Sequence, residues 1–270
     1  MSRPHSTRYT VAALLLLGLA VVVLVSLGQW QMRRSDERRA ILAAIEAGRK
    51  QAPLLLTPAT PPADMTPWRV AQASGTWLPQ FSVLLDNRNH DGKPGYWLAT
   101  PLLLDAATNR AVLVLRGWLP RVIQGQGEPQ LPATPEGMQT VQGELSVRVP
   151  RLFELWSLGG ADAAALPAAL PVAGGTLPQV QNLPLDDYAR ATGLNLLPTV
   201  LSQGSQVDDG LVRDWPQPSV DFQQNTSYAV QWFAFGAIAA IAWLVVLGGA
   251  IRRRRQRVDQ QAQARMRARR

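Results

Sequence analysis

Two long uncharged runs dominate the pattern of hydrophobic and polar positions along the chain. Residues 10–27 form an 18-residue run rich in Leu, Val and Ala, and residues 229–251 form a 23-residue run. At about 1.5 Å per helical residue, such runs approach or exceed the roughly 30 Å of a bilayer's hydrocarbon core. Apolar runs of this length are rare in soluble core helices. The pattern therefore predicts two transmembrane helices, over residues 10–30 and 228–251.

A cleaved signal peptide is the alternative interpretation of the first run. Ser26 and Gly28 are small enough to suit a cleavage site. The apolar stretch is, however, longer than the roughly 7–15 residues of a signal-peptide core. We therefore favour an uncleaved membrane anchor.

Charge is concentrated at the two ends of the chain. Residues 1–27 carry two arginines and no acidic residue, whereas residues 252–270 carry nine arginines and one aspartate. Residues 28–251 carry 16 basic and 18 acidic residues, which is a net charge of −2. The interior of the chain therefore gives no electrostatic reason to bind nucleic acid.

The basic ends also predict the orientation in the membrane. The positive-inside rule places residues 1–9 and 252–270 in the cytoplasm, which agrees with an even number of spans. Residues 31–227 then lie on the far side, which is the periplasm if the membrane is a bacterial inner membrane. The arginine-rich tail is either a topology anchor on anionic lipid or a docking strip for a ribosome or partner, and we favour the anchor.

Between the spans the pattern predicts a single domain. Residues 35–47 place Ile41 and Ile45 one helical turn apart and are followed by Gly48, which predicts a helix continuing from the membrane. An irregular proline-rich stretch follows at residues 53–62. Apolar positions separated by Gly, Pro and Asn clusters then predict strands over residues 68–73, 81–86, 96–104, 111–118 and 140–149.

The rest of this domain contains turn, loop and helix signals. Residues 91–95 predict a hairpin turn, and the low-complexity residues 157–176 are expected to form a loop without a packed role. A short helix is predicted over residues 185–191 and a last strand over residues 197–203. We therefore predict the α+β class, with two transmembrane helices flanking a mostly antiparallel β domain that curls into a barrel or a sandwich.

The residues offer little catalytic chemistry. The chain has no cysteine, which excludes a disulfide framework, a Cys-ligated metal site and a thiol nucleophile, and its two histidines are His5 and His90. His90 is a candidate general base for a membrane-tethered periplasmic hydrolase, but we favour an exposed histidine at the hairpin tip. The paired acids Asp186-Asp187 and Asp208-Asp209 are expected in solvent. The residues thus favour a protein that is not an enzyme.

Aromatic and amide side chains gather where each span meets the far side of the membrane. Trp30 and Gln31 close the first span, and Tyr228, Gln231 and Trp232 open the second. Trp and Tyr are common at the headgroup level, so these aromatic residues are expected to be interfacial anchors. The two glutamines have similar depths. We expect them to pair with each other or with a polar group of a ligand.

A series of motifs runs through the chain in a fixed order. The first is Leu27-Gly28-Gln29-Trp30-Gln31 with Arg34, and the last is Tyr228-Ala229-Val230-Gln231-Trp232-Phe233. Between them lie Gly75-Thr76-Trp77, Leu85-Asp86-Asn87-Arg88, Pro94-Gly95-Tyr96, Thr100-Pro101-Leu102 and Arg116-Gly117-Trp118-Leu119-Pro120. This ordered set resembles the surfeit-locus (Surf-one type) family of cytochrome c oxidase assembly factors. The resemblance covers almost the whole chain except the arginine tail and the low-complexity stretch.

The resemblance implies a non-catalytic helper that assists delivery of haem a into the large subunit of cytochrome c oxidase. It implies two spans around a periplasmic domain, and haem a as transient cargo rather than as a resident cofactor. The oxidase large subunit and a haem a synthase are the partners it implies. An envelope scaffold for another complex is the remaining alternative.

One position departs from the family's pattern. The resemblance implies a histidine, considered a haem ligand and usual in similar members, three residues before the Tyr-Ala pair, and here that residue is Asn225. Asparagine is not a usual axial ligand of haem iron. We expect a surface on which the porphyrin lies against Trp232 and Phe235. Arg34 and Arg116 are candidates to pair a propionate, although a structural role is favoured for each. The expected haem or partner contacts are Trp30, Gln31, Arg34, Arg116, Asn225, Tyr228, Gln231 and Trp232.

Overall fold

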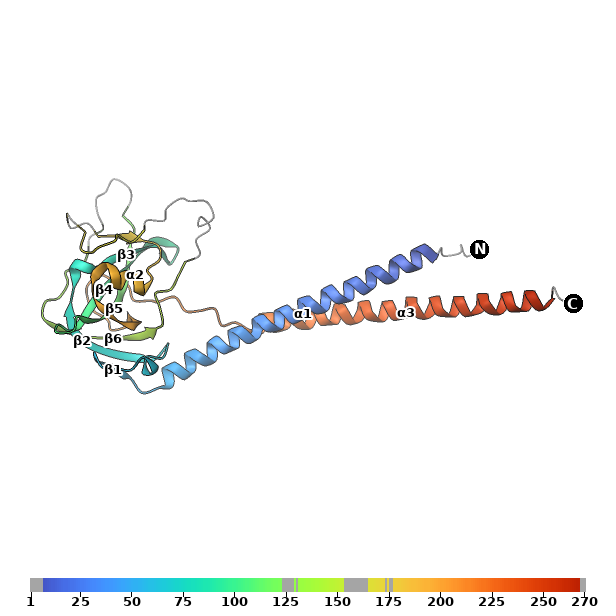
Figure 1. The fold of residues 1–270 in the computed structure, drawn as a ribbon, viewed down its shortest axis with the longest axis horizontal. Helices are drawn as coiled ribbons and strands as arrows, with labels where there is room; N and C mark the ends of the chain where they lie inside the picture. The colour runs from blue at the N-terminus through green and yellow to red at the C-terminus, as the bar shows by residue number, and fades with distance from the viewer. Residues whose placement is uncertain are drawn as a thin grey trace. The chain divides into compact units, whose positions relative to one another are not determined.

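The computed structural model describes residues 7–122, 129, 131–152, 165–172, 174 and 177–267. The chain divides into two compact units, whose elements are drawn in Figure 1. The first unit comprises Met1–Leu42 with Pro218–Arg270, and the second comprises Ala43–Gln217. The second unit is thus inserted between the two segments of the first.

Two long helices dominate the first unit. Helix α1 (Thr7–Lys50) and helix α3 (Gln223–Arg267) are 44 and 45 residues long, and each contains one predicted span. Both are long and apolar enough to cross a membrane, and only 6% of the most apolar stretch of each is buried. Apolar side chains that face outward along such helices indicate a membrane protein. The helix predicted over residues 35–47 is confirmed as the continuation of α1.

The two helices pack antiparallel. Gly28 of α1 lies against Phe233 of α3, since a Cβ added at Gly28 would be 2.6 Å from the phenyl Cε1. Ten residues further along α3, the indole Nε1 of Trp243 donates a hydrogen bond to the carbonyl oxygen of Leu14 at 2.9 Å. Residue numbers therefore rise along one helix as they fall along the other. The absence of a side chain at Gly28 allows close approach at this point.

The second unit is built on an eight-stranded sheet. Its strands, in spatial order, are β1 (Leu54–Leu56), β2 (Val70–Trp77), β6 (Met138–Ser146), β8 (Asn195–Gln203), β5 (Arg110–Pro120), β4 (Lys93–Asp105), β3 (Val83–His90) and β7 (Gln179–Val180). An additional pairing of β2 with β4 closes the ring β2-β6-β8-β5-β4 into a barrel. Five of the strand pairings are antiparallel and three are parallel, so the mostly antiparallel prediction is confirmed.

Hydrophobic side chains fill the barrel and also cover its outer face. One buried cluster draws residues from every strand of the ring, including Ala73, Leu102, Val114, Val141 and Leu201, which places it in the interior. A second cluster joins the opposite face of β3, β4, β5 and β8 to helix α2 (Leu185–Thr192). The side chains of successive strand residues point to opposite faces, so a strand buried on both faces shows continuous hydrophobicity, as β5 does.

The predicted hairpin and short helix are confirmed. Strands β3 and β4 pair directly across a turn at Asp91 and Gly92, whose φ angles of 48° and 74° lie in the left-handed region. Asp-Gly is a favoured sequence for such a two-residue turn, because Gly adopts positive φ without steric cost. Helix α2 ends at Thr192 and is followed by Gly193 with φ 69°, which is the expected glycine C-cap.

Two sequence predictions need correction. The low-complexity segment was expected to lack a packed role, yet Leu170 is 7% exposed and its amide donates a hydrogen bond to the carbonyl of Ala191 at 2.7 Å. Residues 157–164, 173, 175 and 176 of that segment lie outside the described residues. The proline-rich stretch also contains strand β1, which pairs in parallel with β2. A three-residue strand is too short to show periodicity, so only the pairing reveals it.

Candidate functional site

The residues expected at the membrane boundary occupy one level of the helix pair. Trp30 is 53% exposed, Tyr228 is 44% exposed and Gln231 is also exposed. Trp232 is half-buried, and its indole makes a T-shaped contact with the ring of Phe235, with centroids 6.2 Å apart. Large exposed aromatic rings at one level of a helix pair match the interfacial belt of membrane proteins.

The two glutamines lie at similar levels of the helix pair and are not bonded to each other. The antiparallel register brings Gln31 of α1 close to the level of Gln231, because Gly28 faces Phe233 and Ser35 faces Thr226. Among the hydrogen bonds of the described residues, none joins the two amides. Gln31 is half-buried and Gln231 is exposed. Both amide groups are therefore available to another polar partner.

A polar layer joins the helices one turn further from the spans. The Ser35 hydroxyl is fully buried and lies 2.9 Å from the Thr226 hydroxyl, with the carbonyl of Phe222 at 3.3 Å. Arg38 donates a hydrogen bond to the carbonyl of Asp221 at 2.5 Å. The guanidinium of Arg39 lies 4.8 Å from the centre of the Phe222 ring. These contacts hold the base of the helix pair in one register.

Asn225 belongs to this layer and is incompletely bonded. The residue is 8% exposed, and its amide nitrogen Nδ2 is buried with no hydrogen-bond partner among the described residues. An unpaired buried amide costs about 1–3 kcal/mol. Asn225 does not line the cavity on this part of the helix pair, so its unpaired donor is not presented to that site.

A cavity of about 470 Å³ lies on the same part of the helix pair. Its lining combines one guanidinium, one phenyl ring and several hydroxyl or amide groups, from Arg39, Phe222, Gln223, Thr226, Ser227, Val230 and Gln231. None of these residues is a His, Cys or Met. The cavity can therefore contact an anionic or aromatic group, but these side chains do not include the usual axial ligands of haem iron.

Arg34 and Arg116 lie in different environments and in different units. Arg34 is exposed and pairs with Glu37 one turn along α1 at 3.2 Å. Arg116, on β5, is only 3% exposed. Its Nη1 donates to the Thr134 hydroxyl at 3.0 Å, and its guanidinium lies 5.1 Å from the centre of the Trp77 ring. Of the two, only Arg34 is accessible to a ligand from solvent.

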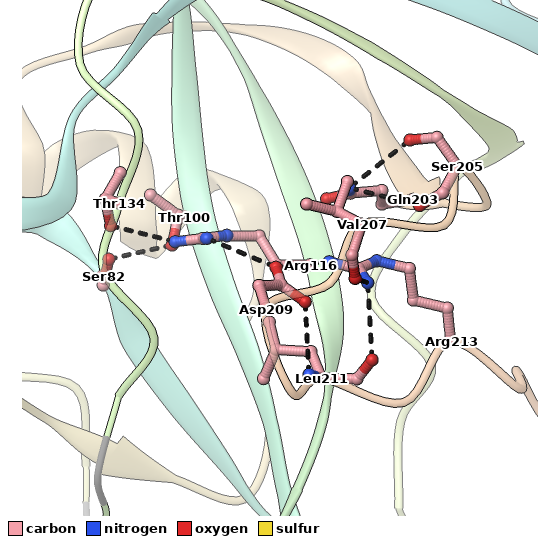
Figure 2. Close-up of polar contacts among 10 residues, drawn as sticks. All are labelled: Ser82, Thr100, Arg116, Thr134, Gln203, Ser205, Val207, Asp209, Leu211 and Arg213. Atoms are coloured by element: carbon pink, nitrogen blue, oxygen red, sulfur yellow. Dashed lines mark hydrogen bonds and ion pairs between the residues drawn. The ribbon is translucent and has the colours of Figure 1, made fainter.

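Figure 2 shows that Arg116 and Arg213 converge on one carboxylate, that of Asp209. Oδ2 of Asp209 is 2.6 Å from Nη2 of Arg213 and 3.8 Å from Nη2 of Arg116. The Asp209 side chain is 12% exposed, so the expectation that this acid lies in solvent is wrong. Burial lowers the pKa of Arg116, while the neighbouring Asp209 acts in the opposite direction. The cluster is a buried structural network of the barrel domain.

The barrel domain also contains a tryptophan-lined cavity that the motifs did not indicate. It measures about 550 Å³, and its aromatic lining consists of Trp68, Trp97 and Trp215. Arg88, of the motif at residues 85–88, lies 4.4 Å from the centre of the Trp97 ring, and burial lowers the pKa of Arg88 to about 10. The nine tryptophans of the chain were the only signal for such a site.

His90 is less exposed than expected. Its side chain is 21% exposed, Nε2 lies 3.6 Å from Oδ2 of Asp91, and its ring centre is 5.2 Å from that of Trp118. The histidine is therefore half-buried against β5 rather than free at the hairpin tip. The described residues contain no group of three or more His, Asp or Glu residues placed to hold a metal ion.

Comparison with known proteins gives a family match that covers most of these features. The sequence model of the SURF1 family matches residues 18–237. The chain belongs to the SURF1 family. The match runs from within α1, through the whole barrel domain, to the first part of α3. It therefore includes both the membrane-boundary residues and the Arg116 cluster, and it leaves out residues 238–270.

Individual SURF1 relatives support the same assignment. A SURF1-like protein of Rickettsia felis is 32% identical over 102 residues, which is 37% of this chain and 43% of that protein. An uncharacterized SURF1-like protein of Mycobacterium bovis is 25% identical over 256 residues, which covers 90% of this chain and 85% of the relative. The cytochrome oxidase assembly protein SHY1 of Saccharomyces cerevisiae is 30% identical over 95 residues, which is 34% of this chain and 24% of the yeast protein.

Proposed function

We propose that this chain is a non-catalytic assembly factor for haem–copper cytochrome c oxidase in a bacterial inner membrane. The observation that carries the proposal is membership of the SURF1 family over residues 18–237, together with a yeast relative named as a cytochrome oxidase assembly protein. Within this role, the chain assists insertion of haem a into the oxidase large subunit. A haem a synthase, as the source of that haem, is a second partner.

The membrane arrangement supports the proposal. Two apolar helices border the barrel domain in the sequence, and arginines cluster at the C-terminal end. With both termini in the cytoplasm, the barrel domain lies in the periplasm. In this arrangement the two helices leave the lipid near residues 30 and 228. A membrane-embedded oxidase subunit is accessible to the chain at that level.

The chemistry of the boundary site supports contact with the periphery of haem a rather than with its iron. Arg39 offers a guanidinium that pairs with a propionate, and Arg34 offers a second one at the exposed surface. The amide of Gln231, which lines the cavity, supplies a hydrogen-bond donor for a cargo oxygen. Trp232 and Phe222 supply aromatic surface. Because this set lacks the usual axial ligands, haem a is held weakly, as suits cargo that is passed on.

A role without catalysis accords with the surroundings of His90. Its side chain contacts Asp91 and the Trp118 ring, and these contacts account for its place in the fold without a catalytic role. The hydrolase alternative requires His90, whereas the assembly role does not. Replacement of His90 by Ala therefore separates them, since oxidase assembly should survive it.

The decisive experiment is deletion of the chain in its host. We expect the haem a absorbance of the membranes to fall, while oxidases that contain only b-type haem remain unchanged. Re-expression of the chain should restore the signal. Unchanged haem a content after deletion would reject the assembly role.

A second experiment addresses cargo binding by itself. The detergent-purified chain, expressed where haem a is made, should show a Soret band, and changes at Arg39 or Trp232 should weaken it. Asn225→His introduces an imidazole at the position where the family resemblance implies a histidine, and should shift and sharpen the band by ligating the iron. Asn225→Gln is the matched control. If neither the parent chain nor the histidine variant binds haem, direct delivery is excluded while an assembly role remains open to the deletion test.

A further inference from the structure

Helix α3 continues past its apolar run into a dense group of arginines. The run ends at residue 251, and Arg252, Arg253, Arg254, Arg255 and Arg257 follow on the same uninterrupted helix, all exposed. We call these five residues the arginine collar. They lie beyond residue 237, where the match to the SURF1 family ends. The motifs therefore leave the collar without a role.

The collar surrounds the helix completely. Four consecutive arginines cover every side of an α-helix, because one turn contains 3.6 residues. A helix that docks in a protein groove presents one face, with anchors three or four residues apart. A charge that points in all directions instead matches a partner that surrounds the helix. The headgroup layer of a bilayer does so wherever a helix leaves the membrane.

The length of the apolar run places the collar at this layer. The 23 residues from 229 to 251 span about 34 Å as a helix, slightly more than the roughly 30 Å hydrocarbon core of a bilayer. The position of basic residues on the other helix, α1, is consistent with this placement. Trp243 contacts Leu14 and lies against Gly18, so the antiparallel register brings Arg8 of α1 to the level of the collar. Basic residues of both helices thus meet at one end of the pair.

We propose that the arginine collar binds the phosphate headgroups of anionic phospholipids. Guanidinium groups form paired hydrogen bonds to phosphate oxygens, and the collar contains arginine and no lysine. Residues 252–257 contain no acidic side chain to neutralise them. Zwitterionic headgroups carry their own cation, so lipids with net negative charge are bound in preference. The proposal rests on the membrane-spanning helices and is independent of the oxidase role.

The C-terminal tail also contains arginines outside the collar that serve as a control. Residues 258–264 carry no basic side chain and span about 10 Å of helix, roughly one Debye length at 0.1 M salt. Arg265 and Arg267 therefore lie beyond the reach of the headgroup charge. The double variant R265Q/R267Q removes the same charge as R253Q/R254Q. Only R253Q/R254Q removes charge from the collar.

The test uses the full chain in lipid nanodiscs made of phosphatidylcholine alone or with about one third phosphatidylglycerol. Trypsin cleavage after Arg255 and Arg257, which every variant retains, is followed by mass spectrometry. We expect cleavage at least about tenfold slower in the anionic discs. R253Q/R254Q should lose most of this protection, whereas R265Q/R267Q should keep it. High salt should also reduce it.

Three outcomes would overturn the proposal. Equal cleavage rates in the two lipid compositions would show that the collar does not distinguish anionic lipid. Equal loss of protection in the two double variants would show that charge anywhere on the tail suffices. Protection in phosphatidylcholine discs that appears only when poly-U RNA or an acidic protein is added would reassign the collar to a soluble polyanion.

Discussion

Asp209 is a single carboxylate shared by two buried guanidinium groups. The side chains of Arg116 and Arg213 are 3% and 0% exposed, and the Nε atom of each is buried without a hydrogen-bond partner among the described residues. Burial of a charge is costly unless an opposite charge and hydrogen bonds compensate it. The stability of this part of the barrel therefore depends strongly on one acidic side chain.

Replacement of Asp209 by Asn should destabilise the barrel domain by about 3–5 kcal/mol, because it leaves two buried cations without a counter-ion. Denaturant unfolding of the full chain in detergent, followed by tryptophan fluorescence, measures the loss. Asp208→Asn is the matched control, since Asp208 is adjacent and exposed, and it should change the free energy of unfolding by less than about 0.5 kcal/mol. Equal effects of the two changes would contradict a structural role for the cluster.

At the scale of the elements, α1 and α3 make a close contact at Gly28. Gly28 is buried, and a Cβ at this position would lie 2.6–2.9 Å from three atoms of the Phe233 ring. At Gly18, by contrast, the nearest atom would be Nε1 of Trp243 at 3.6 Å, which is ordinary van der Waals contact. The hydrophobic effect does not drive helices together in lipid, because lipid tails are as apolar as the side chains. Close van der Waals packing, as at Gly28, therefore contributes strongly to helix association.

Gly28→Ala should weaken association of α1 with α3 by about 1–3 kcal/mol, the usual cost of overpacking. Gly18→Ala should not, although it gains the same helix propensity. Because the chain has no cysteine, a Ser35→Cys/Thr226→Cys pair can report the effect through its rate of disulfide formation. Adding Phe233→Ala to Gly28→Ala should restore the rate. An unchanged rate in Gly28→Ala would show that the contact does not hold the pair.

At the scale of the whole molecule, the chain consists of a membrane helix pair and a barrel that contains its own core. Every residue of the three hydrophobic core clusters belongs to Ala43–Gln217. The barrel is therefore stabilised from within, and the helices need only anchor it.

Protease added to intact spheroplasts tests this arrangement. We expect it to cleave within the barrel domain, at the connections to α1 and α3, and to spare the arginine-rich tail. Antibodies against tags at residue 1 and residue 270 would identify the protected fragments. Cleavage of the tail together with protection of the barrel would reverse the proposed orientation, and the placement of the domain would have to be revised.

Local patterns were sufficient for both membrane helices, for most of the strands and for the hairpin at residues 91–95. Each of these follows from interactions between near neighbours: apolar length for a span, alternation for a strand, and Asp91-Gly92 for the turn. The ordered motifs were likewise sufficient to indicate the family. The resemblance also implies a histidine at the position of Asn225, which stays a prediction.

Contacts between residues far apart in the chain decided the remaining features of the fold and of the candidate site. Closure of β2 on β4, the parallel edge strand β1 and the packing of Leu170 depend on residues far apart in the chain, and no periodicity encodes them. The same holds for the pairing of Asp209 with Arg116. In the sequence it is one of two adjacent acids with no sign of burial, and only the fold places a buried guanidinium against it, because desolvation is a property of the assembled core.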